Sequence, residues 1–174
     1  MKRSEIKPIP AYFEKYINLC QDVQYYDAIQ QSIHDLRIIP IADWDKLGHS
    51  VYAPDKWTVK EILQHIIDTE RVFMFRALVF ARGESQKVIS FDENAYASVS
   101  EANRRSVLEL IEELQHTHDS LMRLFRSFTN QMLTRMCVVS NGEYPVAAIP
   151  FILLGHQRSH INVIKEKYHP LLED

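Results

Sequence analysis

Near the C-terminus the chain reads Leu154-Gly155-His156-Gln157-Arg158-Ser159-His160-Ile161-Asn162-Val163-Ile164. Two histidines four residues apart on a helix project from the same side, so both imidazoles can reach one metal ion. The same stripe carries the apolar residues Ile149, Ile152, Leu153, Val163 and Ile164. This pattern predicts that both rings point into a helical core, where neutral imidazoles need hydrogen-bond partners or a metal ion.

The composition is that of an ordinary globular protein, and we expect one domain over residues 1–174. Charged residues make up 25% and hydrophobic residues 46% of the chain. A net charge of −3 argues against a nucleic-acid partner bound by neutralising phosphates. No apolar run is long enough for a membrane span, and no apolar h-region follows the basic N-terminus, so we expect a cytoplasmic protein without a membrane partner.

Apolar residues recur mostly at helical spacing, and only four glycines occur, so we predict an all-α fold of four helices. The first helix is expected from Pro10 to Leu36, ending at Ile38-Ile39-Pro40. A long connection leads to the second helix. Thr58 and Glu61 have the spacing of a capping box at its start, and Gly83 is expected to stop it after Arg82.

The second half of the chain predicts two more helices. The link Gly83–Ala97 is long enough to span a bundle, which would make the second and third helices parallel. Ser98 and Glu101 repeat the capping-box spacing and are expected to open the third helix. Residues 137–144 resemble a hairpin turning at Asn141-Gly142. Pro145 suits the first turn of the last helix, which is expected to end near Tyr168.

With His156 and His160 as its only ligands, a metal ion would have an incomplete coordination sphere. A third ligand is therefore expected on another helix. His65 lies on the inner stripe of the second helix, and His118 lies one turn from two apolar residues of the third. His65 is the better placed, because an antiparallel last helix would meet its end of the second helix, but the spacing alone leaves His118 open as a competitor. The remaining four histidines are predicted to be solvated on polar faces or in loops: His34, His49, His116 and His169. Cys20 and Cys137 form no metal or redox motif and are predicted to be buried hydrophobes, not nucleophiles.

Two stretches resemble the DinB/YfiT-like superfamily. The segment Trp57-Thr58-Val59-Lys60-Glu61-Ile62-Leu63-Gln64-His65-Ile66-Ile67-Asp68-Thr69-Glu70 is similar to its second-helix signature. The segment Gly155-His156-Gln157-Arg158-Ser159-His160-Ile161 is similar to its fourth-helix HxxxH motif. The link Phe91–Tyr96 and the Asn103-Arg104-Arg105 opening of the third helix extend the resemblance over nearly the whole chain.

The resemblance implies a four-helix bundle in up-down-down-up order, with one divalent metal ion, zinc or nickel, bound by His65, His156 and His160. It thereby favours His65 over His118. It also implies a metal-dependent enzyme that acts on a small molecule, either as a hydrolase or as a transferase of a low-molecular-weight thiol. Members often dimerise, so a homodimer is expected.

Three neutral imidazoles leave coordination positions open, so the nucleophile would be a metal-bound water or thiolate and no catalytic side chain is predicted. For Asp92, Glu93 and Asn94 the favoured interpretation is a solvated loop, and for Arg104 and Arg105 an exposed helix start. The functional alternative places the first three near the mouth of the site and uses one of the arginines to bind an anionic substrate group. The alternative function is a non-enzymatic metal-binding or stress-responsive bundle, in which the metal only stabilises the fold.

Overall fold

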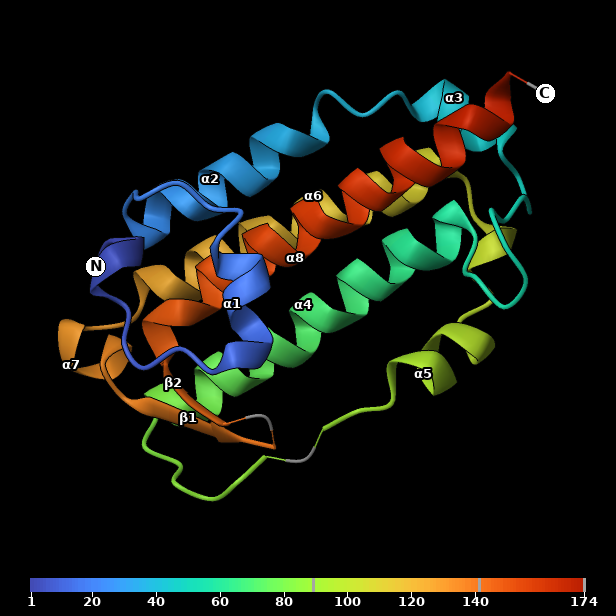
Figure 1. Cartoon of the computed structure of the whole chain (residues 1–174). Helices are drawn as coiled ribbons and strands as arrows, with labels where there is room; N and C mark the ends of the chain where they lie inside the picture. Colours follow the sequence, from blue (N-terminus) through green and yellow to red (C-terminus); the bar gives the residue numbers. More distant parts are fainter. Residues whose placement is uncertain (89, 141, 174) are drawn as a thin grey trace.

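The computed structural model describes every residue of the chain except Ile89, Asn141 and Asp174. Four long helices form a bundle (Figure 1). They are α2 (Tyr25–Leu36), α4 (Val59–Ala81), α6 (Val107–Arg126) and α8 (Ile149–Val163). The predicted all-α four-helix bundle is confirmed, and the described strands form one small hairpin.

The second and third long helices, α4 and α6, run parallel. At the start of α4, Thr58 Oγ1 donates a hydrogen bond of 2.8 Å to Asn103 Oδ1, just before α6 begins. Farther along both helices, Glu70 meets His118. The contacts therefore advance in the same direction along both helices. The long connection between the two helices allows this arrangement, as its length predicted.

The last helix runs antiparallel to α4 and parallel to α2. The Tyr168 hydroxyl donates to the Trp57 carbonyl before α4 begins, and His65 farther along α4 meets His156 nearer the start of α8. The N-terminal part of the chain instead advances together with α8. Cys20 contacts Phe151, and Ser32 in α2 then contacts Gln157. The bundle thus has the up-down-down-up order.

The predicted single helix from Pro10 to Leu36 is wrong, because the chain breaks into α1 (Ala11–Ile17) and α2. The N-terminal residues pair with the intervening segment. The Arg3 amide donates to the Val23 carbonyl, and the Ser4 amide donates to the Asp22 carboxylate at 2.8 Å. The first of these contacts occupies a backbone carbonyl that a continuous helix would need. Apolar spacing runs on through the break, which is why the sequence pattern did not reveal it.

The predicted opening of the third helix at Ser98 is also wrong. Ser98 lies inside a short helix, α5 (Glu93–Val99), and Glu101 adopts a left-handed conformation. The capping box that opens α6 is formed by Ser106 and Glu109, which exchange hydrogen bonds of 3.2 and 2.8 Å. Two serines carry the same spacing to a glutamate, and only the second directly precedes the apolar stripe of α6.

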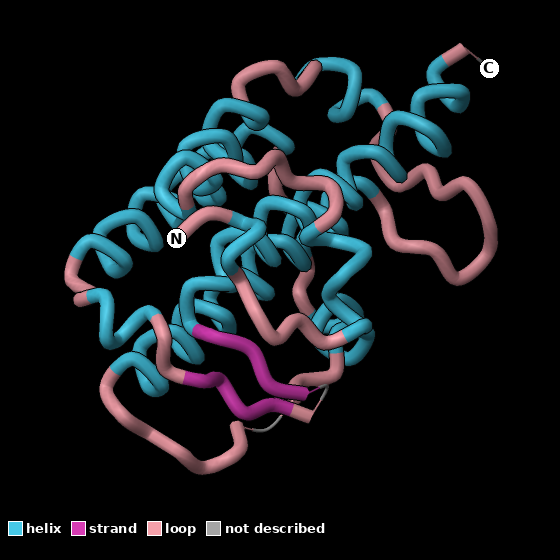
Figure 2. Tube along the Cα trace, turned by 60° about the vertical axis from the view of Figure 1, so that its left-hand side comes forward, coloured by secondary structure: helices cyan, strands magenta, loops and turns pink. Residues whose placement is uncertain are grey.

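Shorter elements connect the long helices. The connection before α4 contains α3 (Ile41–Lys46), and α7 (Asn130–Leu133) precedes the hairpin. Strands β1 (Met136–Val139) and β2 (Gly142–Pro145) pair antiparallel, so the predicted hairpin is confirmed, although Asn141 of its expected turn lies outside the described residues. Figure 2 shows the hairpin at one end of the bundle and the C-terminus at the other.

The last helix starts later than predicted. Pro145 ends β2 and precedes a 3-10 turn, Val146–Ala148, whereas Pro150 occupies the first turn of α8. Proline is tolerated there because that position needs no amide donor. After Val163 the chain continues as a π-helical turn, Ile164–Tyr168, and a 3-10 turn, His169–Leu172.

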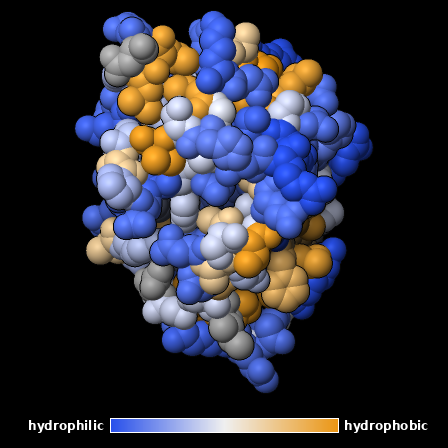
Figure 3. Space-filling view, turned by 90° about the vertical axis from the view of Figure 1, so that its right-hand side faces the viewer, coloured by the Kyte–Doolittle hydropathy of each residue, from blue (hydrophilic) through white to orange (hydrophobic). Residues whose placement is uncertain are grey.

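Hydrophobic side chains gather in the core, as the apolar pattern of the sequence predicts. The face at the end of the bundle where α3 and α5 lie is largely hydrophilic, with scattered hydrophobic patches (Figure 3). Inside the bundle, two clusters of buried hydrophobic residues occupy opposite ends. No helix among the described residues is both long and apolar enough to cross a membrane.

Candidate metal centre

His65 is positioned by a firmly fixed helix start. The Thr58 amide donates to Glu61 Oε2 at 2.7 Å, and the Glu61 amide donates to Thr58 Oγ1 at 3.2 Å, which completes the predicted capping box. Such a pair satisfies two amides that the first turn would otherwise leave without partners. His65 follows two turns later on the inner face of α4, where it is 5% exposed. The Trp57 ring packs against its imidazole, with centroids 4.8 Å apart.

His156 is positioned by a close approach between α1 and α8. A Cβ atom added to Gly155 would lie 1.9 Å from the Tyr16 carbonyl oxygen, so only glycine fits at this position. The approach brings the Tyr16 ring to 5.3 Å from the His156 ring in an edge-on arrangement. This close approach explains why glycine, a residue with poor helix propensity, stands inside α8 beside His156.

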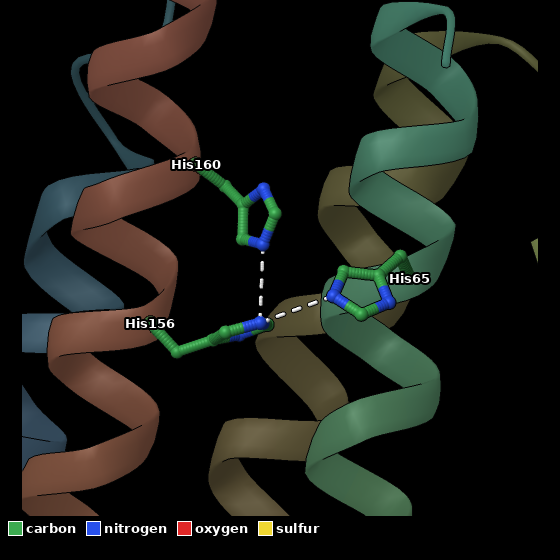
Figure 4. Close-up of side chains that lie close together, drawn as sticks. All are labelled: His65, His156 and His160. Atoms are coloured by element: carbon green, nitrogen blue, oxygen red, sulfur yellow. Dashed lines mark hydrogen bonds between the residues drawn. The ribbon is translucent and has the colours of Figure 1, made fainter. Parts of the chain in front are cut away.

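Three histidine nitrogens converge between α4 and α8 (Figure 4). His156 Nε2 lies 3.0 Å from His65 Nε2 and 3.1 Å from His160 Nε2. Ligand atoms of the three residues all lie within 4.8 Å of one another. The structure therefore brings together the three histidines that the resemblance selected, and we refer to them as the histidine trio.

The histidine trio cannot satisfy its own nitrogens by hydrogen bonding. A neutral imidazole carries one N–H donor and one acceptor nitrogen, and each nitrogen offers either its proton or one in-plane lone pair. His156 Nε2 faces two other Nε2 atoms, so at most one of the two contacts is a hydrogen bond at any time. A cation placed among the three nitrogens would instead accept a lone pair from each of them.

The electrostatics of the histidine trio favour the neutral form that binds metal. Burial, followed by the neighbouring His160, lowers the pKa of His65 to about 3. Burial and then Lys15 lower the pKa of His160 to about 4. Burial, with the two neighbouring histidines next, holds the pKa of His156 well below its usual value. Near neutral pH all three rings are uncharged, so protons do not compete for the nitrogens.

The donor set fits a divalent metal ion of the zinc or nickel type. Imidazole nitrogen suits both metals. Nitrogens bound to one zinc at 2.0–2.1 Å lie roughly 3.3 Å apart in tetrahedral geometry, which is close to the two short distances in the histidine trio. His156 Nδ1 is buried and has no hydrogen-bond partner among the described residues. The second nitrogen of a ligating histidine commonly donates to a carboxylate, carbonyl or water, and at His156 no described protein group fills this role.

Comparison with known proteins assigns the chain to a family. The family model of the DinB superfamily matches residues 15–164, which include all three histidines. The chain belongs to the DinB superfamily. No curated protein sequence shows a significant match to this DinB-superfamily chain.

Two solved structures share the fold of this DinB-superfamily chain. YfiT from Bacillus subtilis, described as a probable metal-dependent hydrolase with an unusual four-helix bundle topology, has 16% sequence identity and a TM-score of 0.68. The match covers 95% of this chain and 91% of YfiT. A mycothiol-dependent maleylpyruvate isomerase has 11% identity and a TM-score of 0.59, over 85% of this chain and 58% of the isomerase. At these identities the likeness concerns the fold.

His118, the other candidate for the third ligand, belongs to a separate buried network in this DinB-superfamily chain. His118 Nδ1 lies 2.8 Å from Glu70 Oε1, and its Nε2 lies 2.7 Å from Gln157 Oε1. Ser32 Oγ donates to Gln157 Oε1 at 2.8 Å and completes what we call the Glu70 network. Burial lowers the pKa of His118, but the Glu70 charge and the hydrogen bonds outweigh burial, so the pKa is raised.

The sequence missed the Glu70 network because its four members lie on four helices. Only Gln157 carries a signal, since an uncharged polar residue stands beside His156 in an apolar helix. The remaining histidines mostly lie where the sequence placed them: His34, His49 and His116 are exposed. His169 is partly buried and accepts a hydrogen bond from Trp44 Nε1 at 3.0 Å, so the prediction that it is solvated is wrong. It interacts with the Trp44 indole in the packed end of the bundle.

Residues predicted near the mouth divide into two groups. Glu93 and Asn94 line a cavity that also reaches His156, whereas Asp92 caps α5 by accepting from the Asn94 and Ala95 amides at 3.0 Å. The two arginines considered for a substrate anion lie elsewhere. Arg104 pairs with Glu101 on the surface, and Arg105 pairs with Glu113.

Neither cysteine is available as a nucleophile. Burial raises the pKa of Cys20 to about 11 and that of Cys137 to about 12. The Cys20 thiol also donates to the Phe151 carbonyl at 3.2 Å. Because the thiolate is the reactive form, both side chains remain unreactive near neutral pH.

Proposed function

We propose that this protein is a divalent-metal-dependent enzyme that acts on a small molecule, with zinc or nickel held by His65, His156 and His160. The observation that carries the proposal is the convergence of three neutral Nε2 atoms beside open cavities. Among the described residues, no cysteine, aspartate, glutamate or further histidine joins the cluster. Three protein ligands leave positions for exchangeable groups, which is typical of catalytic sites and not of closed structural ones.

Two cavities each reach a different member of the histidine trio, which favours a reaction between two small molecules. One, of about 320 Å³, reaches His156, and the other, of about 290 Å³, reaches His160. Asn94 lines both, so the start of α5 lies where they approach each other. We therefore favour transfer of a low-molecular-weight thiol to an electrophile, with hydrolysis as the related reaction when water takes the place of the thiol.

Side chains of this chain would prepare the site for either reaction. When bound, a divalent ion supplies Lewis-acid chemistry that favours deprotonation of a water or thiol. The three histidines remain neutral, and the Trp57 and Tyr16 rings cover His65 and His156. In thiol transfer, the S–H proton leaves to solvent and the sulfur forms a bond to the electrophilic carbon, while the bond from that carbon to its leaving group breaks and the leaving group departs with the electron pair. All three histidines come from one chain, so the site does not require the proposed homodimer for its ligands.

The relatives support a metal-dependent activity without naming the substrate. YfiT is described as a probable metal-dependent hydrolase, and the isomerase of similar fold is described as mycothiol-dependent. These descriptions concern those proteins. They are compatible with a site in which a metal ion activates either water or a thiol.

The decisive test is elemental analysis of untagged protein purified without added metal. We expect about one zinc or nickel ion per chain in the wild type, and loss of the ion in His65→Ala and His160→Ala. His116→Ala is the matched control, because His116 is an exposed histidine on α6 and should leave the metal content unchanged. A wild type that holds no metal and takes up neither added zinc nor added nickel would overturn the proposal.

A second measurement separates the enzyme from a bundle that uses metal only for stability. Calorimetry of the metal-free protein should still show a cooperative unfolding transition, and metal-loaded protein should accelerate the reaction of a low-molecular-weight thiol with an electrophile. A purely structural metal predicts that removing the ion unfolds the protein, because binding free energy is then folding free energy. That outcome would support the non-enzymatic alternative.

A further inference from the structure

The cavity that reaches His156 also contains a buried arginine. Its walls come from α1, α4 and α8 and from the segment that leads into α5. His156 and Arg76 both line it, together with the aromatic rings of Phe13, Tyr16 and Phe73. The cavity therefore joins the histidine trio to a positive charge through a largely aromatic space, and its volume of about 320 Å³ suits a small molecule.

Arg76 has no protein counterion among the described residues. Its side chain is 5% exposed, and its Nε atom is buried without a hydrogen-bond partner. The described arginine–carboxylate pairs use Arg71, Arg104, Arg105 and Arg158 instead. The Tyr144 hydroxyl, whose pKa is raised by burial against the lowering effect of the Arg76 charge, faces the guanidinium, but the contact does not reach hydrogen-bond geometry and a neutral hydroxyl is no counterion. A guanidinium stays charged when buried, so its desolvation needs compensation by an anion.

The surroundings of Arg76 leave its hydrogen-bonding edge for a ligand. The guanidinium carbon of Arg76 lies over the Phe73 ring, 4.7 Å from its centroid. The guanidinium N–H groups lie within the plane of the group and form a fork that matches a planar carboxylate. Among the described residues, no carboxylate pairs with this fork.

A second polar group on the same wall lacks a partner. Thr69 lies seven residues before Arg76 on α4, so the two side chains share one helix face, about 10.5 Å apart along the axis. Thr69 Oγ1 is buried without a hydrogen-bond partner, and Thr69 lines the cavity. Buried hydroxyl groups are normally hydrogen-bonded. A ligand that extends from His156 past Thr69 to Arg76 would satisfy both groups.

We propose that the substrate of this enzyme is a small carboxylate with an apolar or aromatic body, and that Arg76 binds its carboxylate group in this cavity. Glu93 also lines the cavity without forming an ion pair with Arg76, so the cavity carries its positive charge at Arg76 and a negative charge at Glu93. This inference rests on the proposed function for its catalytic meaning. Binding of the carboxylate itself does not depend on the metal ion.

The test uses benzoate as the probe and benzamide as its neutral isostere. Titrations followed by NMR are run on the full-length wild type as purified and after chelation. We expect saturable binding of benzoate in both forms, at least tenfold tighter than that of benzamide. Equal affinity for the two probes would overturn the inference, because no charge would then be recognised. Inorganic phosphate is the third probe, and tighter, Arg76-dependent binding of phosphate would overturn the assignment of a carboxylate.

Two variants of Arg76 separate recognition from structure. Arg76→Met removes the charge at similar length and should weaken benzoate binding at least tenfold, while the metal content stays at the wild-type value. Arg76→Lys keeps the charge without the planar fork, so its affinity for benzoate should lie between those of the wild type and Arg76→Met. The unfolding midpoint of Arg76→Met should be unchanged or raised, since a buried unpaired charge is replaced by an apolar side chain. A large fall in the midpoint would assign Arg76 to the fold and overturn the inference.

The outcomes distinguish this inference from the proposed function. Unchanged benzoate binding in Arg76→Met, lost only on chelation, would mean that the probe binds the metal ion, which overturns the inference and leaves the metal site intact. Arg76-dependent benzoate binding in a wild type that holds no metal as purified, and that takes up neither added zinc nor added nickel, would support anion recognition and overturn the proposed metal-dependent activity.

Discussion

The histidine trio and the Glu70 network, which contains the single histidine His118, lie next to each other in this bundle, and their environments differ. In the Glu70 network, His118 uses both ring nitrogens, one toward Glu70 and the other toward Gln157 and Ser32. In the histidine trio, the Nε2 atoms face one another and His156 Nδ1 has no partner among the described residues. His156 and Gln157 are adjacent in the chain, so the two environments meet on α8.

Burial alone therefore does not identify a metal site. His118 is 1% exposed and His156 is 6% exposed, so exposure does not separate them. Their pKa directions do, because the Glu70 carboxylate raises the pKa of His118 whereas burial among other histidines lowers that of His156. A buried histidine whose nitrogens meet only other nitrogens needs a ligand from outside the chain.

Breaking the Glu70 network should have the largest effect on stability. His118→Leu leaves Glu70 as a buried charge without its partner and is expected to lower the free energy of unfolding by about 3–5 kcal/mol. Urea unfolding of the metal-free protein measures the loss. The double variant Glu70→Gln/His118→Leu should recover part of it, because no charge then remains buried. A loss below about 1 kcal/mol in the single variant would contradict the assigned ion pair.

Metal binding should stabilise the fold through the histidine trio and not through the Glu70 network. With free zinc at about 1,000 times the dissociation constant, the expected gain is about 4 kcal/mol, because zinc binds the folded state. Thermal unfolding with and without zinc measures this gain. His160→Ala should abolish it, and Glu70→Gln should retain it. An equal zinc effect in wild type and His160→Ala would mean that zinc binds elsewhere.

The two groups should respond to pH with opposite sign. His65 and His160 have folded pKa values of about 3 and 4, below the usual value, so the unfolded state binds more protons and stability falls as the pH drops below about 6.5. Each contributes a loss of about 1 kcal/mol between pH 6.5 and 5.5. His118 has a raised pKa, so its contribution is present below about 6.5 and is lost as the pH rises through its folded pKa.

Urea unfolding of metal-free protein at several pH values checks this sign. His160→Ala should show a shallower loss on acidification than the wild type, by about 1 kcal/mol over that pH unit. His116→Ala, the exposed control, should follow the wild type. A metal-free wild type that gains stability on acidification through this range would contradict the neutral, buried state of the histidine trio.

The smallest effect is expected at the start of α4. Thr58→Ala removes the cap and its hydrogen bond to Asn103, and should lower the free energy of unfolding by about 1 kcal/mol. Thr58 lies nearer to His65 than to Glu70 along the helix, so zinc affinity should weaken while the Glu70 network keeps its contribution to stability. Zinc titration and urea unfolding of the variant measure the two effects. Unchanged zinc affinity despite the lost stability would show that the first turn does not position His65.

Local signals in the sequence determined several elements of the fold. Three of them depend only on neighbouring residues, and each lies where the pattern placed it: the Thr58–Glu61 capping box, the end of α4 before Gly83 and the break before Pro40. The pair His156 and His160 faces inward because helical spacing fixes which residues share a side. These features require no knowledge of the rest of the molecule.

Other features depend on contacts between distant segments, and the pattern misplaced or missed them. The break after α1 comes from pairing with the N-terminal residues, and the choice between Ser98 and Ser106 depends on where α6 packs. The sequence placed His65 best as third ligand and left His118 open as its competitor. The resemblance favoured His65, and the geometry places His65, and not His118, beside the pair.

The sequence by itself determined that the chain forms helices and that two histidines share the buried face of the last one, because both follow from local periodicity. Only the tertiary structure decided which nitrogens are satisfied by protein partners and which are not. Glu70 and Arg76 lie on the same helix as charged residues of opposite sign, yet one meets His118 and the other meets a cavity. That difference depends on which helix packs opposite each residue, and periodicity along one helix carries no information about it.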